Sequence, residues 1–458
     1  MRAVWAWESG SGFLENHLAK LLDEAALSPQ DRGLAMELAH GIVRWQRTLD
    51  RLIDLKATRK PEGLPRILLR LGLYQLFWLS RVPDYAAVDE TVSLARDRGF
   101  QHQAGFINAM LRAYGREREA TQAMLAAWRK DEPAMGSSFP EWLVARWRER
   151  FGPEKTAALM EWNNQPPKTY ARVNRLKTEP GPLLEKWRLE DVEYDFGRWD
   201  WVDENQTFQL KSHPSLKRME SFRDGWFYIQ DPSTLLAVRT LAPRPGEFIL
   251  DLCAAPGGKT CYVAQCMANQ GRLVACDTSQ DRLVLLTENI QRLGVTNVET
   301  RVVPESLAIT ENPFPPERRF DRILVDAPCS NTGVLRRRVD LRWRLQASEI
   351  QRLCQVQKGL LGRAATLVRP GGLVVYSTCS MEPEENSLMV KEFLAIHDEF
   401  ELESERELNP LVDGVDGAYV AALRRLRNVR PGPESESESE GKSGDKGKAA
   451  FTPDEDQE

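Results

Sequence analysis

The fold is decided by Phe248-Ile249-Leu250-Asp251-Leu252-Cys253-Ala254-Ala255-Pro256-Gly257-Gly258-Lys259-Thr260. A short apolar run ends in an acid, and a turn of small residues then opens a new segment. This pattern is typical of a buried parallel strand that leads into a helix. Gly257 and Gly258 have no Cβ, so the backbone can take positive φ and a ligand can approach it closely. In open α/β sheets such a turn lies beyond the carboxyl ends of the strands, where ligands bind.

A second strand is expected at 271–277 and ends in Asp277, which is placed to accept hydrogen bonds from a ribose diol. The glycine spacing of the first turn does not match the G-x-G-x-x-G fingerprint of dinucleotide folds, and the P-loop pattern is absent here. A cofactor with one nucleoside and no phosphates fits better than either. The alternative is an ordinary strand–turn–helix joint without a ligand.

Strands and helices alternate over residues 230–430, with strands expected near 248–252, 272–277, 300–304, 321–326 and 372–377. This alternation predicts a parallel, doubly wound, Rossmann-like α/β domain. Asp231 or Ser233 is the expected N-cap of the helix before the first strand. Residues 431–458 have few apolar side chains and a Ser-Glu repeat, so we expect a disordered acidic tail.

Residues 1–137 show the three- and four-residue apolar spacing of helices throughout and predict an all-helical bundle. This region resembles the NusB-like antitermination-factor fold, an all-helical RNA-binding domain. The resemblance is carried by residues 37–45, 74–76, 86–92 and, most specifically, Gly105-Phe106-Ile107-Asn108-Ala109-Met110-Leu111-Arg112. It implies RNA contact or a protein-partner surface. The arginines expected to be exposed, on a solvated face or a phosphate-binding face, are Arg44, Arg47, Arg51, Arg59, Arg66 and Arg70.

Residues 138–229 predict a small linking α+β subdomain, in which 169–176 alternates like a strand and prolines break up the segment. Trp187, Trp199 and Trp201 are expected to pack inside this unit, and base stacking is the sharper alternative. The subdomain would then form one wall of an RNA channel.

The chain has 458 residues, 42% hydrophobic and 28% charged, which is a soluble globular composition with room for two or three domains. The formal net charge is -5, but residues 431–458 hold nine acids and three bases, so the rest of the chain is near +1. The acidic total therefore does not argue against an RNA partner.

No targeting or membrane segment is expected. Met1-Arg2-Ala3-Val4-Trp5 continues into an amphipathic pattern rather than a signal peptide, and no apolar run approaches ~18 residues. Seven cysteines without paired spacing indicate reduced thiols and a cytoplasmic protein. The five histidines are scattered, so no metal site is expected.

Two cysteines follow strand ends, on the same rim as the glycine turn. Cys329 lies in Asp326-Ala327-Pro328-Cys329-Ser330-Asn331-Thr332-Gly333, and Cys379 follows the next strand in Thr378-Cys379-Ser380. Loops at this rim hold the active residues of such folds. Reactive thiols need an exposed, electropositive niche that lowers their pKa. The other five cysteines are expected to be small buried hydrophobes.

Methyl transfer to carbon 5 of a pyrimidine needs a nucleophilic thiolate, an acid and a base. Carbon 5 is a poor nucleophile, and a thiolate that adds to carbon 6 activates it through covalent catalysis. An acid near ring N3 favours the addition, and a base must remove the proton of carbon 5. Asp326 is in range of the ring edge and of a cofactor amino group. The residues alone do not order the two thiols.

The region 225–424 resembles the bacterial ribosomal RNA cytosine-5 methyltransferases of the Sun/Fmu type. The motifs are 251–260, 326–333, 378–386 and Asp416-Gly417-Ala418-Tyr419-Val420-Ala421, which resembles the closing strand of that family. The resemblance implies S-adenosylmethionine held by Cys253, Ala254, Ala255, Pro256, Gly257, Gly258 and Lys259. It also implies Asp277 on the ribose, Asp326 near the methionine end, Cys379 as nucleophile and Cys329 assisting product release. Glu305 stands where the family usually has an aspartate near the adenine.

The expected activity is S-adenosylmethionine-dependent methylation of cytosine carbon 5 in 16S ribosomal RNA by a monomer. The alternatives are the same chemistry on transfer RNA and a non-catalytic RNA-binding factor that keeps the fold. The intact pair Cys329 and Cys379 disfavours the second. Four arginines after the Cys329 loop are expected to contact phosphate; they are Arg336, Arg337, Arg338 and Arg342.

Overall fold

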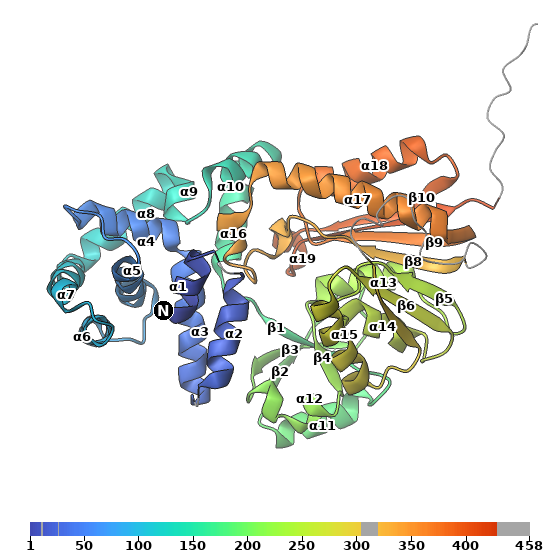
Figure 1. The fold of residues 1–458 in the computed structure, drawn as a ribbon, viewed down its shortest axis with the longest axis horizontal. Helices are drawn as coiled ribbons and strands as arrows, with labels where there is room; N and C mark the ends of the chain where they lie inside the picture. The colour runs from blue at the N-terminus through green and yellow to red at the C-terminus, as the bar shows by residue number, and fades with distance from the viewer. Residues whose placement is uncertain (11, 26, 304–318, 428–458) are drawn as a thin grey trace, which may run out of the picture.

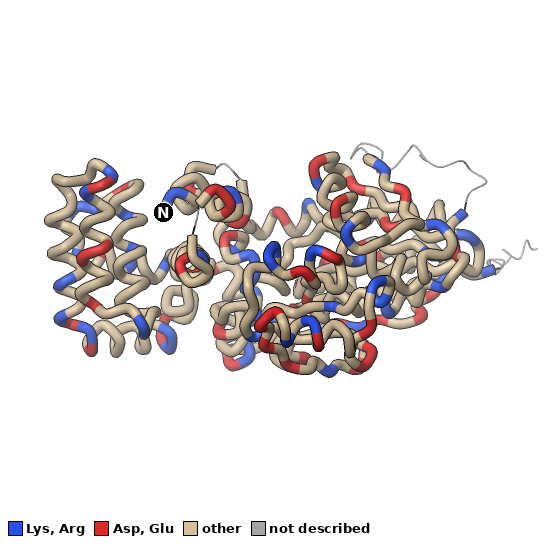
Figure 2. Tube along the Cα trace, turned by 90° about the horizontal axis from the view of Figure 1, so that it is seen from below, with Lys and Arg blue, Asp and Glu red and all other residues tan. Residues whose placement is uncertain are grey.

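The structure is a computed structural model that describes residues 1–10, 12–25, 27–303 and 319–427. Glu305 and the predicted tail at 431–458 lie outside the described residues. Acidic and basic positions are interspersed in every part of the described trace (Figure 2). Among the described helices, none combines the length and the apolar character that crossing a bilayer requires.

The N-terminal region is helical, as predicted, and buries apolar side chains from successive helices in one core. Its helices are α1 (Arg2–Glu8), α2 (Leu14–Glu24), α3 (Pro29–Arg44), α4 (Gln46–Lys56), α5 (Leu64–Trp78), α6 (Asp84–Asp97), α7 (Gln101–Arg116), α8 (Arg118–Asp131) and α9 (Pro133–Gly136). The expectation of exposed arginines is wrong for Arg44 and Arg70, which are buried. Arg70 is buried because it forms ion pairs with Asp50 and Glu8, both distant in sequence.

The linking region starts with helix α10 (Glu141–Asn164), which bends at Gly152, where φ is +79°. The described residues that follow form a four-stranded antiparallel sheet in the order β2-β3-β1-β4. Its elements are β1 (Thr169–Val173), α11 (Pro180–Leu189), β2 (Glu193–Phe196), β3 (Thr207–Ser212), α12 (Glu220–Arg223) and β4 (Phe227–Ile229). Trp187 is buried in the core of this subdomain, as expected, whereas Trp201 is buried in the core of the α/β domain and Trp199 packs against that core.

The C-terminal region is the predicted Rossmann-like α/β domain. Its described strands form a seven-stranded sheet in the order β10-β11-β9-β8-β5-β6-β7. The strands are β5 (Phe248–Asp251), β6 (Arg272–Asp277), β7 (Val298–Val302), β8 (Phe320–Asp326), β9 (Val368–Thr378), β10 (Phe400–Leu408) and β11 (Ala418–Arg425). Strands β5 to β9 pair in parallel, and β11 runs antiparallel between β9 and β10.

Helices cover both faces of this sheet (Figure 1). Helices α17 (Ala347–Leu367) and α18 (Ser387–Ile396) pack on one face, and α13 (Leu235–Leu241), α14 (Gly258–Cys266) and α15 (Gln280–Leu293) pack on the other. Since the central strands are parallel, the carboxyl ends of β5, β8 and β9 meet at one edge. The glycine turn and both cysteine loops therefore leave the sheet at the same edge.

The segment that follows the Cys329 loop docks on the helical region. Asp340 Oδ2 accepts a hydrogen bond from the Leu14 backbone N–H at 3.1 Å, and in α16 (Leu341–Arg344) the Trp343 indole donates to the Val43 carbonyl at 2.7 Å. The buried Arg342 guanidinium donates to oxygens of Arg44, Ser138, Asn163 and Asn164. The helical region and the α/β domain thus share a polar interface at this segment.

Candidate active site

The structure brings Cys329 and Cys379 together. Cys329 follows β8 and Cys379 follows β9, and these two strands are parallel neighbours. The two Sγ atoms are 3.4 Å apart, although 50 residues separate them in the chain. Cys329 is 6% exposed and Cys379 is half-buried. The Cys379 residue is therefore the more open of the pair to a ligand.

The surroundings shift the pKa values of the two thiols in opposite directions. A hydrogen bond from Cys329 lowers the pKa of the Cys379 thiol below its ordinary value. Burial and the negative charge of Asp326 oppose this shift, and the charges of Lys259 and Arg338 add to it. The same hydrogen bond, together with burial, holds the pKa of the Cys329 thiol well above its ordinary value. This arrangement favours the thiolate on Cys379 over the thiolate on Cys329.

Asp326 and Lys259 form an ion pair beside the cysteines. The Lys259 Nζ donates to Asp326 Oδ2 at 2.8 Å, and the Ser377 hydroxyl donates to Asp326 Oδ1 at 2.8 Å. Burial by itself lowers the pKa of Lys259, but Asp326 outweighs it and the pKa of the ammonium is raised. Lys259 is 17% exposed at its side chain, so it is not a free surface residue of α14.

The glycine turn is closely packed where it enters α14. Gly257 has φ of +104°, and a Cβ added there would lie 2.4 Å from the Leu286 Cδ1 atom. A Cβ on Gly258 would lie 3.0 Å from the Tyr228 ring. Residues 253–259 therefore follow a backbone path that larger side chains at these two positions would not allow.

Asp277 lies at the end of β6, next to this turn. Its Oδ2 accepts from the Ala255 backbone N–H at 3.2 Å, and its Oδ1 accepts from the Ser279 backbone N–H at 3.1 Å and from Arg282 at 3.2 Å. The carboxylate is 4% exposed. These bonds join the end of the second strand to the glycine turn.

A sulfonium nucleoside fits this set of residues. Asp251 is 1% exposed, and its Oδ2 accepts from the Thr260 hydroxyl at 2.7 Å. Its Oδ1 is buried without a hydrogen-bond partner among the described residues, so one acceptor at the end of β5 is available. Burial raises the pKa of Asp251 to about 7. The glycine turn, the acid at the end of β6 and this unpartnered oxygen suit the donors of S-adenosylmethionine.

Three residues that hold this site have no role that the sequence alone indicates. From the sequence, Asp251 is only the acid that ends a strand. Asn331 Oδ1 lies 3.0 Å from Cys379 Sγ, and Asn331 takes the left-handed conformation, with φ of +57°. Glu385 is fully buried between the two cysteine loops. Glu385 belongs to the motif at 378–386, but its burial follows only from the fold.

The expected phosphate contacts are wrong for three of the four arginines. Arg336 and Arg342 are buried, and Arg337 is held by ion pairs to Asp231 and Asp416. These partners lie far away in the sequence, which is why the run looked like a solvated basic cluster. Arg338 is exposed, and the structure records no ion pair for it among the described residues.

The five other cysteines do not all fit the expectation of burial. Cys261, Cys276 and Cys354 are buried, Cys253 is half-buried, and Cys266 is exposed at the end of α14. All seven cysteines lie in the described ranges and are free thiols. Within those ranges, no cluster of three or more His, Cys, Asp or Glu side chains is arranged to hold a metal ion.

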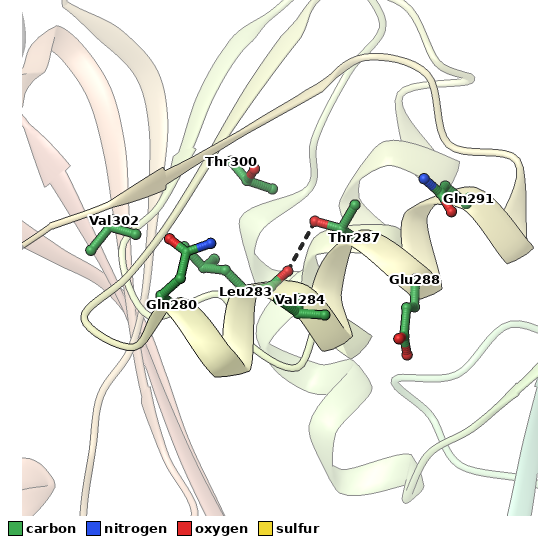
Figure 3. A pocket seen from close by; sticks show the side chains of 8 residues that line it. All are labelled: Gln280, Leu283, Val284, Thr287, Glu288, Gln291, Thr300 and Val302. Carbon is green, nitrogen blue, oxygen red and sulfur yellow. Dashed lines mark hydrogen bonds between the residues drawn. The ribbon is translucent and has the colours of Figure 1, made fainter.

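A separate hollow of about 400 Å³ lies between α15 and the edge strand β7 (Figure 3). Its lining residues are Gln280, Leu283, Val284, Thr287, Glu288, Gln291, Thr300 and Val302. None of the predicted cofactor or catalytic residues is among them, so this hollow is distinct from the cysteine site.

Three family profiles match the chain in succession. The profile of the NusB family matches residues 2–116, and that of the ferredoxin-like domain of RsmF/B-like methyltransferases matches residues 139–199. The profile of the 16S rRNA methyltransferase RsmB/F matches residues 238–431. The predicted order of a helical NusB-like region, an α+β linker and a methyltransferase domain is confirmed.

Curated relatives align over most of the chain. A Bacillus subtilis protein named probable ribosomal RNA small subunit methyltransferase B is 33% identical over 450 residues, which cover 93% of this chain and 97% of that protein. An Escherichia coli ribosomal RNA small subunit methyltransferase B is 35% identical over 371 residues, covering 80% and 83%.

Solved structures share the fold. The crystal structure of PH0851 has a TM-score of 0.75 at 23% identity and covers 93% of this chain and 97% of its own. A methyltransferase homolog protein from Pyrococcus horikoshii has a TM-score of 0.55 at 29% identity and covers 64% and 98%. The aligned relatives, with the matching profile, show that the chain belongs to the 16S rRNA methyltransferase RsmB/F family.

Proposed function

We propose that this chain methylates carbon 5 of a cytosine in 16S ribosomal RNA, with S-adenosylmethionine as the methyl donor and a covalent bond between Cys379 and carbon 6. The observation that carries the proposal is the 3.4 Å contact between Cys379 and Cys329 Sγ atoms, beside the Lys259–Asp326 pair. The printed names of the aligned relatives, which are small-subunit ribosomal RNA methyltransferases, support the choice of RNA.

The reaction starts with Cys379. Its thiolate adds to carbon 6, a carbon–sulfur bond forms, and the electron pair of the 5,6 double bond moves into the ring. The Lys259 ammonium, held by Asp326, stabilises the negative charge that develops at the ring edge. When bound, S-adenosylmethionine supplies the electrophilic methyl group that carbon 5 receives, and it leaves as a neutral thioether.

Cys329 completes the cycle. Once the Cys379 sulfur is bonded to carbon, it no longer accepts the hydrogen bond that raises the pKa of Cys329, so Cys329 releases its proton to solvent. The resulting thiolate removes the proton of carbon 5, the 5,6 double bond re-forms, and the carbon–sulfur bond breaks. Cys379 returns as the thiolate and Cys329 as the thiol, with one proton released per methyl group transferred.

The target cytosine has to be single-stranded or flipped out of its stack, because carbon 6 is not accessible within a helix. Arg338 is exposed next to the cysteine loops and suits a phosphate of the flanking strand. The helical region is joined to the same segment through α16, which supports a role for it in holding neighbouring RNA.

The test is methyl transfer from labelled S-adenosylmethionine to total RNA, followed by bisulfite mapping with and without the protein. We expect one protected cytosine in 16S ribosomal RNA, and none with the Cys379→Ala variant. A product confined to transfer RNA would overturn the assigned substrate. Absence of any labelled RNA would favour the non-catalytic RNA-binding alternative.

A further inference from the structure

Glu385 is a buried carboxylate that the proposed reaction does not use. It ends the short helical turn η5 (Pro383–Glu385), which follows the Cys379 loop and precedes α18. It is fully buried, and among the described residues no Lys, Arg or His forms an ion pair with it. Burial raises the pKa of Glu385. A buried charge without a counter-ion is costly unless hydrogen bonds compensate for it.

Those hydrogen bonds come from both cysteine loops. Oε1 accepts from the Ser330 backbone N–H at 2.9 Å and from the Gln357 amide at 3.1 Å. Oε2 accepts from the Ser330 hydroxyl and from the Ser380 hydroxyl. Ser330 directly follows Cys329 and Ser380 directly follows Cys379, so one carboxylate joins the two loops at the residues next to the sulfurs.

The two loops also contact each other directly, both at the sulfurs and further along the chain. The Thr332 hydroxyl accepts from the Met381 backbone N–H at 2.9 Å, and the Gly333 N–H donates to the Cys379 carbonyl at 3.0 Å. The two serine hydroxyls lie 3.0 Å apart. Because both can donate to the same carboxylate oxygen, the charge of Glu385 allows them to face each other at this distance.

We propose that Glu385 is a positioning residue that holds the Cys329 and Cys379 loops in the register where the two thiols share one proton. This proposal rests on the proposed function and adds a residue that acts through the cysteines without touching the substrate. Its charge also raises the pKa of Cys329, after the larger effects of the Cys379 hydrogen bond and burial, and so keeps the shared proton on Cys329.

The test uses the thiols themselves and needs no RNA. The rate of Cys379 alkylation by iodoacetamide is followed from pH 5 to pH 10 in the full-length protein, with the modified cysteine identified by mass spectrometry. Two variants are compared: Glu385→Gln, and the double variant Ser330→Ala/Ser380→Ala, which keeps the charge but removes two donors. Glu384→Gln is the matched control, because this neighbour is only half-buried and pairs with Arg146 instead.

We expect each variant to slow alkylation of Cys379 about tenfold at neutral pH, as a rise of about one pKa unit requires, with the control unchanged. Loss of the Glu385 charge alone would lower the thiol pKa values and speed up alkylation. Slower alkylation therefore reports the loss of the register between the two loops. If Glu385→Gln does not give a cooperative thermal transition, the double variant decides. Wild-type alkylation profiles in the folded variants would overturn the proposal, whether or not the protein methylates cytosine.

Discussion

Lys259 Nζ donates to Asp326 Oδ2 across 2.8 Å, which joins the first turn of α14 to the carboxyl end of β8. The pair links the predicted cofactor turn to the cysteine loops, and no charge run in the sequence indicated it. Because Lys259 also lowers the pKa of Cys379, the ammonium influences both the ring edge and the nucleophile.

Replacing this lysine should move the pH dependence of the reaction. In Lys259→Met, Cys379 loses a neighbouring positive charge, so its pKa rises and the thiolate is lost at a higher pH. The acidic limb of the kcat/KM profile should therefore shift to higher pH, and the plateau should fall about 100-fold. The measurement is methyl transfer from pH 5 to pH 9. Lys391→Met, at an exposed position of α18, should leave the profile unchanged.

The two cysteines should separate the formation of the covalent bond from its release. Cys329→Ala should accumulate a protein–RNA adduct, since the proton of carbon 5 is not removed, and Cys379→Ala should form none. The adduct is detected as slow-migrating labelled RNA on a denaturing gel. Cys266→Ala, which removes an exposed thiol, should behave as wild type. The opposite pattern for the first two variants would exchange the proposed roles.

Asp251 should make stability depend on pH. Its folded pKa of about 7 lies above its ordinary value, so in this window the folded chain holds a proton that the unfolded chain has lost. This contribution is complete below the ordinary pKa and is lost as pH rises to about 7. Relative to Asp251→Asn, the wild-type free energy of unfolding should fall by about 1.4 kcal/mol per pH unit over that range. Urea unfolding at several pH values measures this difference, and Asp398→Asn serves as an exposed control.

Arg338 should contribute to RNA affinity. Arg338→Ala removes one exposed positive charge, so binding should weaken and the salt dependence of the binding constant should decrease by about one counter-ion. Binding to a 16S fragment is measured at several salt concentrations. Arg337→Ala should instead lower the thermal transition, because it breaks the ion pairs with Asp231 and Asp416. An unchanged salt slope for Arg338→Ala would exclude a phosphate contact.

Arg342 should stabilise the interface between the helical region and the α/β domain. In Arg342→Met the buried oxygens of Arg44, Ser138 and Asn163 lose a donor, and each unsatisfied group costs about 1–3 kcal/mol. We expect a loss of at least about 3 kcal/mol in denaturant unfolding and faster proteolysis between the two regions. Arg352→Ala, an exposed arginine on α17, should show neither effect.

The sequence was sufficient for the order of the elements, because the signals are local. Apolar spacing predicted the N-terminal helices, and the apolar runs before Asp251, Asp277 and Asp326 predicted three parallel strands. Strand β10 was not predicted, since its Glu-rich sequence, Phe400–Leu408, lies at the exposed edge of the sheet and lacks an apolar alternation. Placing both cysteines beyond strand ends was enough to expect them at one rim.

Ion pairs and hydrogen bonds between residues far apart in the chain could not be predicted from the sequence. The burial of Arg70 depends on Asp50 and Glu8, and the burial of Arg336 depends on Asp416, 80 residues away. Charged residues were assigned to the surface because their composition gave no sign of these partners. The same limit hid Glu385, whose donors belong to loops that only the parallel pairing of β8 and β9 brings together.

The docking of α16 makes the helical region part of the scaffold around the nucleophile and not a tethered accessory. Severing the chain ahead of α10 would leave Asp340 and Trp343 without their hydrogen-bond partners and expose Val339 to water. This unsupported stretch begins at Val339, on the segment that follows the Cys329 loop. A truncated catalytic fragment would therefore lose thiol geometry before it lost its sheet.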